Sequence, residues 1–202
     1  MRLVLATTNL HKILELKTIL KDQLHGIDLL SLRDFPNYES PDETGSTFAE
    51  NAELKALLAA QTLNCHVIAD DSGLVVPALD GEPGIHSRRY AGEDASDKDN
   101  RNKLIEKLKD LPEANRSGYY ECALCFASPE KILKTVRAKC EGSLILEPKG
   151  SLGFGYDPIF VKYDYNKTMA EIDQATKNRI SHRRKALDKL LLTLESLTHT
   201  LT

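Results

Sequence analysis

Residues 66–73 read His-Val-Ile-Ala-Asp-Asp-Ser-Gly, an apolar segment that runs directly into two acidic residues. Residues 66–69 are typical of a buried β-strand. Residues 70–73 predict a turn after that strand, which places Asp70 and Asp71 at a strand's carboxyl end, where α/β sheets commonly bind ligands. Mg²⁺ prefers carboxylate oxygens and is usually held by one or two of them together with substrate phosphates. A turn whose aspartates only cap backbone N–H groups fits these residues equally well.

The rest of the chain alternates strands with helices. Residues 2–8 predict a strand, and a helix follows from about Asn9. Residues 47–60 predict a second helix, since Thr47 and Glu50 have capping-box spacing. Further strands are predicted at 119–127, 132–140 and 158–161, the first two forming a hairpin, and further helices at 97–110 and 176–197.

This pattern predicts an α/β fold with a mixed β-sheet flanked by helices. Strands and helices intermix, and no linker-like tract divides the chain. We therefore expect one domain over residues 1–202, with the region around 117–142 as part of the same fold.

Composition excludes several classes of protein. The chain has 202 residues, of which 41% are hydrophobic and 28% charged, as in ordinary globular proteins. A net charge of -3 argues against a protein that coats nucleic acid. The apolar run at the N-terminus is too short for a signal peptide, and no segment is long enough to span a bilayer. We expect a cytoplasmic protein without nucleic-acid or membrane partners.

Two of the cysteines have the spacing of a possible metal-binding or redox pair. Cys122 and Cys125 form a C-x-x-C motif. Because they fall on a predicted strand, an offset of three directs the two thiols to opposite faces. We expect all four cysteines to be reduced and mostly buried.

Several polar residues are candidates for a site that binds phosphate. Lys12 falls in the first turn of the predicted helix, where backbone N–H groups and the helix dipole favour an anion. Asp42 and Glu43 lie in a polar loop, and either is a possible further metal ligand. Lys55 lies on the second helix. Taken alone, each of these residues is also compatible with a solvated surface.

Residues 153–158 read Gly-Phe-Gly-Tyr-Asp-Pro. Glycines on both sides of Phe154 allow close backbone approach, and an exposed ring can stack on a base, although a core phenylalanine in a glycine-rich turn also fits. Near the C-terminus, Lys177 and Ser181 are i,i+4 neighbours on a predicted helix, and His182 and Arg183 add donors. A solvated helix face is the alternative.

Known catalytic motifs of other classes are absent from the sequence. There is no G-x-x-x-x-G-K-[ST] phosphate loop, no G-x-S-x-G nucleophile elbow and no H-E-x-x-H zinc motif.

Taken in order, the motifs resemble one family. Residues 7–15 match T-x-N-x-x-K-x-x-E, and residues 43–55 match E-T-G-x-[ST]-F-x-E-N-A-x-x-K. Asp-Asp-Ser-Gly-Leu at 70–74, Pro-Gly-Ile at 83–85, residues 153–158 and Ser-His-Arg at 181–183 complete the series. The chain resembles the noncanonical purine nucleoside triphosphate pyrophosphatases, the inosine/xanthosine triphosphate pyrophosphatases of the HAM1-like NTPase family, over residues 3–190.

The resemblance implies hydrolysis of XTP, ITP and dITP to the monophosphate and pyrophosphate, with Mg²⁺, by a homodimer. It also implies an elongated fold with two lobes and a central substrate cleft. Asp71 would be the general base and a metal ligand, with Glu43 and Asp70 assisting the metal. The substrate would be bound by Thr7, Thr8, Asn9, Leu10, His11, Lys12, Lys55, Ser72, Phe154, Gly155, Tyr156, Asp157, Lys177, His182 and Arg183.

Physical chemistry is consistent with these implied roles. Lys12, Lys55 and a metal would neutralise a triphosphate, and a metal with a carboxylate would polarise the attacking water. Donors such as Lys177 can bond a 6-keto oxygen, whereas the amino group of ATP would leave donors facing donors, at about 1–3 kcal/mol for each unsatisfied pair.

Two departures from the family pattern concern base preference. His86 stands where the family has tyrosine, and Arg88 stands where it often has a small residue. Two alternatives stay open: a pyrophosphatase for modified pyrimidine or ordinary nucleotides, and a nucleotide-binding module without catalysis.

Overall fold

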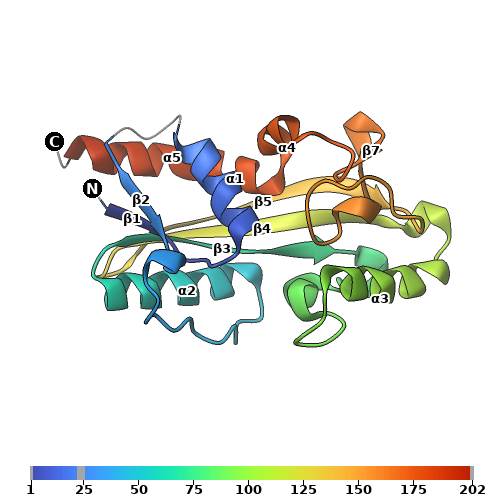
Figure 1. Cartoon of the computed structure of the whole chain (residues 1–202), viewed down its shortest axis with the longest axis horizontal. Helices are drawn as coiled ribbons and strands as arrows, with labels where there is room; N and C mark the ends of the chain where they lie inside the picture. The colour runs from blue at the N-terminus through green and yellow to red at the C-terminus, as the bar shows by residue number, and fades with distance from the viewer. Residues whose placement is uncertain (1, 22–25, 201–202) are drawn as a thin grey trace. The chain divides into compact units, whose positions relative to one another are not determined.

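The computed structural model describes residues 2–21 and 26–200. Its helices and strands follow in the order β1 (Arg2–Leu5), α1 (Leu10–Lys21), β2 (Asp28–Ser31), α2 (Phe48–Leu63), β3 (His66–Val75), α3 (Asp97–Lys109), β4 (Ser117–Ala127), β5 (Ile132–Leu144), β6 (Phe160–Lys162), β7 (Lys167–Thr168), α4 (Gln174–Ile180) and α5 (His182–Thr200) (Figure 1).

Within the described residues, the strands form one seven-stranded sheet in the order β2-β1-β3-β4-β5-β6-β7. β1 is parallel to both β2 and β3, whereas β6 is antiparallel to β5 and β7. The prediction of an α/β fold with a mixed sheet flanked by helices is therefore confirmed. The predicted hairpin is also present, and Ser128 N–H donates to the Lys131 carbonyl, 2.9 Å away, where β4 turns into β5.

The chain divides into two compact units. Unit 1 contains residues 1–71, 122–138 and 183–202, and unit 2 contains residues 72–121 and 139–182. β3, β4 and β5 each contribute residues to both units. Because these strands continue from one unit into the other, we keep the interpretation of a single domain as a proposal.

In unit 1, α1 and α5 pack on one face of the strands, and α2 lies on the other face (Figure 1). The apolar stripes of α1 and α5 meet β1 and β4 in one core, which contains Leu16, Leu20, Leu187, Leu190, Leu3, Leu5 and Phe126. α2 buries small alanines such as Ala52, Ala56 and Ala60. Small side chains let a helix backbone approach the sheet closely, which brings its polar neighbours near the strand residues.

In unit 2, a second core forms around β4 and α3. Leu104 and Leu108 of α3 are fully buried against Tyr120, Phe160 and Ile159.

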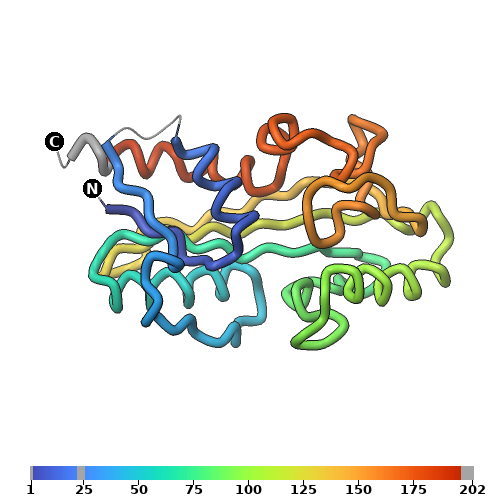
Figure 2. The backbone as a smooth tube through the Cα atoms, viewed as in Figure 1, coloured from blue at the N-terminus to red at the C-terminus, as the bar shows by residue number. Residues whose placement is uncertain are grey.

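The β4–β5 hairpin runs as a long pair of strands (Figure 2). Within residues 2–21 and 26–200, no helix has the length and apolar character needed to cross a membrane.

The predicted turn at residues 70–73 is wrong, because β3 continues through it to Val75. Asp, Ser and Gly are poor strand formers, so local preference favoured a turn. Pairing with neighbouring strands overrides that preference. Since successive side chains of a strand point to opposite faces, Asp70 and Asp71 reach different partners.

The single C-terminal helix predicted for residues 176–197 is also wrong. α4 ends at Ile180, and Ser181 has extended backbone angles, φ -67° and ψ 156°, before α5 begins at His182. Ser181 is fully buried and precedes the first residue of α5, the position where serine is a preferred cap. The break also separates two apolar residues, because Ile180 packs in the core of unit 2 and Leu187 in that of unit 1.

Candidate active site

Asp71 of β3 lies among polar side chains from α2 and the loop before it. Lys55 Nζ donates to Asp71 Oδ1 at 2.8 Å and to Glu43 Oε1 at 2.9 Å. Asn51 Nδ2 approaches Asp71 Oδ2 at 3.4 Å. Asn51 and Lys55 are i,i+4 neighbours, so one face of α2 supplies both. Two of the three carboxylates that were predicted to bind a metal, Asp71 and Glu43, therefore converge on one cation.

A buried asparagine fixes the loop that carries Glu43. Asn51 Oδ1 accepts a hydrogen bond from Gly45 N–H at 2.8 Å. A Cβ atom on Gly45 would lie only 2.7 Å from that oxygen, so a residue without a side chain is needed there. Half of the predicted capping box is present: the Thr47 hydroxyl accepts from Glu50 N–H at 3.1 Å, whereas the Glu50 carboxylate accepts from Ser46 N–H at 2.7 Å.

Asp70 points the other way and belongs to a separate buried network. Its carboxylate pairs with Lys12 of α1 and accepts from Arg183 Nε of α5 at 3.1 Å. The Cys122 thiol lies 3.1 Å from Asp70 Oδ2, and Arg183 also pairs with Glu15. Arg183, which was predicted to bind the nucleoside, is 2% exposed and holds Asp70.

The adjacent aspartates have opposite electrostatic environments. Burial raises the pKa of Asp71 above its ordinary value, and the nearby Glu43 carboxylate adds to this against the opposing effects of Lys55 and Lys12. Burial alone would also raise the pKa of Asp70, but the charges of Arg183 and Lys12 hold it well below the ordinary value. Asp71 is therefore the better proton acceptor of the two, and Asp70 is a fixed anion.

Asp71 and Glu43 fit a hard divalent cation. Among residues 2–21 and 26–200, no three His, Cys, Asp or Glu side chains gather into a ready-made metal cage. Mg²⁺ does not require one, because it is commonly held by one or two carboxylates and by substrate phosphates. The shared contact with Lys55 shows that Asp71 and Glu43 already converge on one positive charge. Cys122 and Cys125 of the C-x-x-C pair are free, buried thiols, and Cys122 lies against Asp70.

The residues around the start of α1 are mostly exposed. Thr8, Asn9, Leu10 and His11 are exposed, and Thr7 is half-buried. Asn9 Oδ1 accepts from the N–H groups of His11 and Lys12 at 2.9 and 3.3 Å. The side chain of Asn9 therefore caps the helix start that was predicted to bind an anion.

In unit 2, Asp157 collects the polar groups predicted to bind the nucleoside. Its Oδ2 accepts from Lys177 Nζ at 2.5 Å and from Phe154 N–H at 3.0 Å, while Oδ1 accepts from Tyr120 OH at 3.2 Å. Lys177 Nζ also lies 5.0 Å from the centre of the Phe154 ring. A buried carboxylate thus fixes both a cation and a half-exposed aromatic ring.

Other predicted residues of unit 2 have mixed surroundings. The rings of His182 and Tyr120 stack at 4.9 Å, with 12° between their planes. Tyr156 is a core residue whose hydroxyl donates to the Ser87 carbonyl at 2.8 Å. Ser72 is half-buried in β3. His86 and Arg88, the two departures from the family pattern, are exposed.

We predict that Gly153→Ala disrupts this group. Gly153 has φ +77°, and a Cβ there would lie 2.1 Å from Asp157 Oδ2 and 3.0 Å from Lys177 Nζ. Gly155→Ala is a matched control, because it shares the left-handed φ, +59°, but no atom lies within 4 Å of its Cβ. Thermal unfolding should show a larger loss for Gly153→Ala than the roughly 1–2 kcal/mol of backbone strain expected for the control. Equal losses would contradict this packing.

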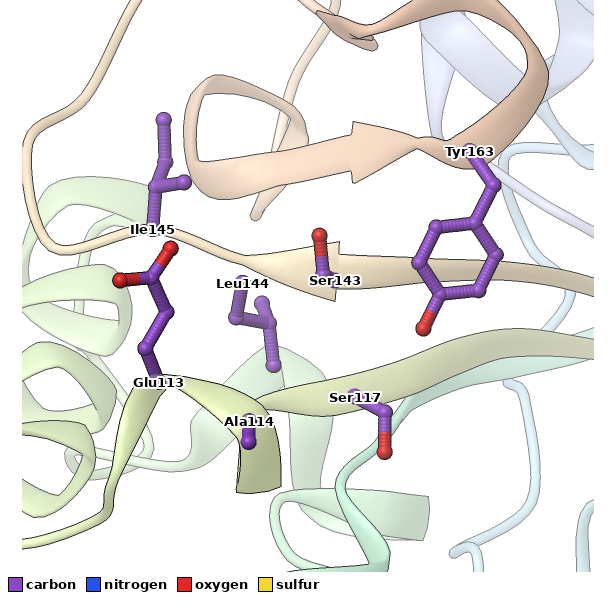
Figure 3. Close-up of a pocket in the computed structure, with 7 residues that line it drawn as sticks. All are labelled: Glu113, Ala114, Ser117, Ser143, Leu144, Ile145 and Tyr163. Atoms are coloured by element: carbon purple, nitrogen blue, oxygen red, sulfur yellow. The ribbon is translucent and has the colours of Figure 1, made fainter.

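One open pocket is lined by none of the predicted site residues. Its volume is about 460 Å³, and its lining includes Glu113, Ser117, Ser143 and Tyr163 (Figure 3). It contains no cationic side chain, which makes it unsuited to a triphosphate.

Several residues of these networks, among them Tyr120, have no predicted role from the sequence. Asn51 had a usable signal, since it lies one turn before Lys55 within a matched motif. Glu15 was part of a motif, but only the structure brings it to Arg183. Cys122 appeared as an apolar strand residue.

Comparisons with known proteins agree with one another. The model of the Ham1 family matches residues 3–193. A Protochlamydia amoebophila protein named dITP/XTP pyrophosphatase is 53% identical over 198 residues, which cover 98% of this chain and 99% of the relative. A Chlamydia abortus protein of the same name is 52% identical, covering 98% and 96%.

Solved structures give the same result. The Staphylococcus aureus Ham1 protein is 41% identical and superimposes with a TM-score of 0.85, covering 97% of this chain and 99% of that one. A HAM1 protein from Coxiella burnetii is 38% identical with a TM-score of 0.88, at the same coverage. The chain therefore belongs to the Ham1 family.

Proposed function

We propose that this protein hydrolyses noncanonical purine nucleoside triphosphates, namely XTP, ITP and dITP, to the monophosphate and pyrophosphate, and so removes deaminated purines from the nucleotide pool. The observation that supports this function most is the Asp71 cluster, which consists of Asp71, Glu43 and Lys55. The Asp71 carboxylate is buried, its pKa is raised, and it shares the Lys55 ammonium group with Glu43. The names of the Protochlamydia and Chlamydia relatives, dITP/XTP pyrophosphatase, support the same reaction and substrate class.

Unit 1 supplies the groups for the phosphates. Lys12 and Lys55 carry positive charge beside the two aspartates, and Thr8, Asn9 and His11 add exposed polar groups at the start of α1. In the proposed reaction, the oxygen of a water forms a bond to phosphorus and the bridge between the α- and β-phosphates breaks. Asp71 accepts the proton of the water, and the two lysines stabilise the charge of the pyrophosphate that leaves.

We propose Mg²⁺ as the cofactor, bound by Asp71 and Glu43 together with substrate phosphates. When bound, it would polarise the phosphoryl oxygens and lower the pKa of water. The structure directs Asp70 toward Lys12 and Arg183, so we assign Asp70 to holding the lysine and not to the metal. A homodimer and a cytoplasmic location, which the family resemblance and the sequence respectively suggested, remain part of the proposal.

Unit 2 supplies the groups for the base. Lys177 Nζ, held by Asp157 beside the Phe154 ring, would donate to a 6-keto oxygen while the ring stacks on the purine. ATP presents an amino group at that position, which cannot accept. A site built on hydrogen bonds discriminates strongly against an analogue that leaves its buried groups unpaired. His182 and Ser72 are proposed to complete this site.

We expect Lys177→Ala to lose at least about tenfold in the preference for ITP over ATP, because the donor to the keto oxygen is removed. The measurement is competition: equal amounts of ITP and ATP are mixed with Mg²⁺, and the loss of each is followed. Lys149→Ala, an exposed lysine of the same unit, is the control.

A double variant separates base reading from folding. Lys177→Ala leaves Asp157 as a buried, unpaired charge, which by itself destabilises. Lys177→Ala combined with Asp157→Asn removes that charge, so it should recover stability without recovering selectivity. Full preference for ITP in either variant would exclude Lys177 from base reading. Preferential loss of ATP or of a pyrimidine triphosphate by the unaltered protein would instead support the alternative pyrophosphatase.

A further inference from the structure

A single helix binds both backbone groups of Gly155, its N–H and its carbonyl, and so holds the two peptide groups that flank its Cα. Asp97 Oδ2 accepts a hydrogen bond from Gly155 N–H at 2.7 Å. Arg101 Nη1 donates to the Gly155 carbonyl, also at 2.7 Å. Asp97 and Arg101 are i,i+4 residues of α3, so they project from the same face of the helix. In Figure 2 the loop that contains Gly155 comes to the beginning of α3.

The helix that makes these contacts is itself firmly fixed. Ser96 and Asp99 form a capping box at its start, and Leu104 and Leu108 are fully buried in the core of unit 2. The side chain of Asn100 also bonds to loop backbone, donating to the Arg88 carbonyl at 2.8 Å. The helix predicted for residues 97–110 therefore also binds backbone groups of other segments, through Asp97, Asn100 and Arg101.

The loop that it holds carries the residues assigned to the base. Gly155 separates Phe154, whose N–H donates to Asp157 Oδ2, from Tyr156 and Asp157. Glycine at φ +59° has a wide choice of other conformations, so the loop needs outside contacts to keep this one. A rotation of the Gly155 peptide would move the ring of Phe154 relative to Lys177.

We propose that Asp97 and Arg101 are positioning residues that fix the Gly155 peptide, and through it Phe154 and Asp157, for recognition of the purine base. This rests on the proposed function of unit 2. The pair acts through the loop and makes no step of the chemistry. It sets the affinity and selectivity for the base and leaves the Asp71 cluster unchanged.

The kinetic test compares Asp97→Ala, Arg101→Ala, Asp97→Asn and Arg101→Lys. The alanine variants should raise the KM for ITP roughly three- to tenfold and lower the preference for ITP over ATP, while kcat stays within about twofold, because one hydrogen bond to the loop is lost. Asparagine still accepts and lysine still donates, so both conservative variants should recover most of the KM. Lys98→Ala, an exposed neighbour on the same turn, is the control.

The Asp97→Asn variant separates the hydrogen bond to the loop from the effect of the Asp97 charge on the helix dipole. Asp97 lies in the first turn of α3, where a negative charge stabilises the helix. Asp97→Asn loses that charge but keeps the acceptor, so an effect as large as that of Asp97→Ala would overturn the proposal. Unchanged KM values and selectivity in both alanine variants, relative to Lys98→Ala, would also overturn it.

A measurement without substrate keeps the test independent of the reaction. Backbone hydrogen exchange of the peptide covering residues 150–158 should be faster in Asp97→Ala and Arg101→Ala than in Lys98→Ala, and close to the unaltered protein in Asp97→Asn. Unchanged exchange in the alanine variants would refute the positioning role. If the unaltered protein did not hydrolyse ITP, the proposed function would fail, while this exchange result would still decide whether α3 holds the loop.

Discussion

The Asp71→Asn variant is expected to lose between about 10²- and 10⁴-fold in kcat on ITP, because the amide cannot accept the proton of the attacking water. Its fold should be retained, since Asn has nearly the same shape and its oxygen can still accept from Lys55. Rates at saturating ITP and Mg²⁺, together with thermal unfolding, measure both effects.

Stability should change little in this variant. A carboxyl group whose pKa is raised in the folded state is less favourable as a charge there than in the unfolded chain, so a neutral side chain removes that cost of folding at pH 7. Lys55, whose pKa Asp71 and Glu43 together raise against the opposing effect of burial, loses one carboxylate partner and keeps Glu43. Asp42→Asn is the matched control, because Asp42 is exposed next to Glu43 and should change the rate by less than about twofold. Near-normal turnover by Asp71→Asn would exclude Asp71 as the base.

Asp70→Asn, one residue earlier in β3, is expected to lose folding stability, whereas Asp71→Asn is expected to lose turnover. It removes the negative charge between Arg183 and Lys12, both of which then lose a partner in a buried network. Breaking such a pair costs about 3–5 kcal/mol of unfolding free energy. Urea unfolding at pH 7 measures this loss, and a change below about 1 kcal/mol would show that the network contributes little.

The same variant has a defined pH dependence. The pKa of Asp70 is depressed in the folded state, so its contribution to stability is complete above the ordinary value of 3.8 and falls as the pH drops below it toward the folded pKa. The difference between the unaltered protein and Asp70→Asn should be constant above about pH 5 and shrink by about 1.4 kcal/mol per pH unit once the pH is well below 3.8. A difference that grew on acidification would contradict the pairing.

The opposite orientations of Asp70 and Asp71 could not be predicted from the sequence. The apolar strand at 66–69 and the importance of residues 70–73 could be predicted, but the turn could not be distinguished from a strand. Only long-range pairing keeps Asp70 and Asp71 in an extended conformation, and the local propensities of the residues do not reveal which strands pair. The alternation of the strand then sends one aspartate to α1 and α5 and the other to α2.

The C-terminal segment gives a similar lesson. Helical structure was predicted correctly for most of this segment. The break at Ser181 was not, because it depends on Ile180 and Leu187 packing in two different cores. Arg183 looked like a surface donor because arginine is rarely buried without partners. Its partners, Glu15 and Asp70, are far away in sequence, so no local pattern could reveal the pairing.

The charged helix α3 is the clearest case of a missed role. Lys98 of this helix is exposed, as charged residues usually are. Asp97 and Arg101 instead meet a loop more than fifty residues later in the chain. The i,i+4 spacing of opposite charges was visible, but it is typical of ordinary surface pairs as well.

The most direct test of the account is the product formed from ITP in the presence of Mg²⁺. Inosine monophosphate and pyrophosphate should appear in equal amounts, and orthophosphate should be detected only after inorganic pyrophosphatase is added. Omitting Mg²⁺ and using Asp71→Asn should each suppress both products. Release of inosine diphosphate and orthophosphate by the unaltered protein would contradict the account.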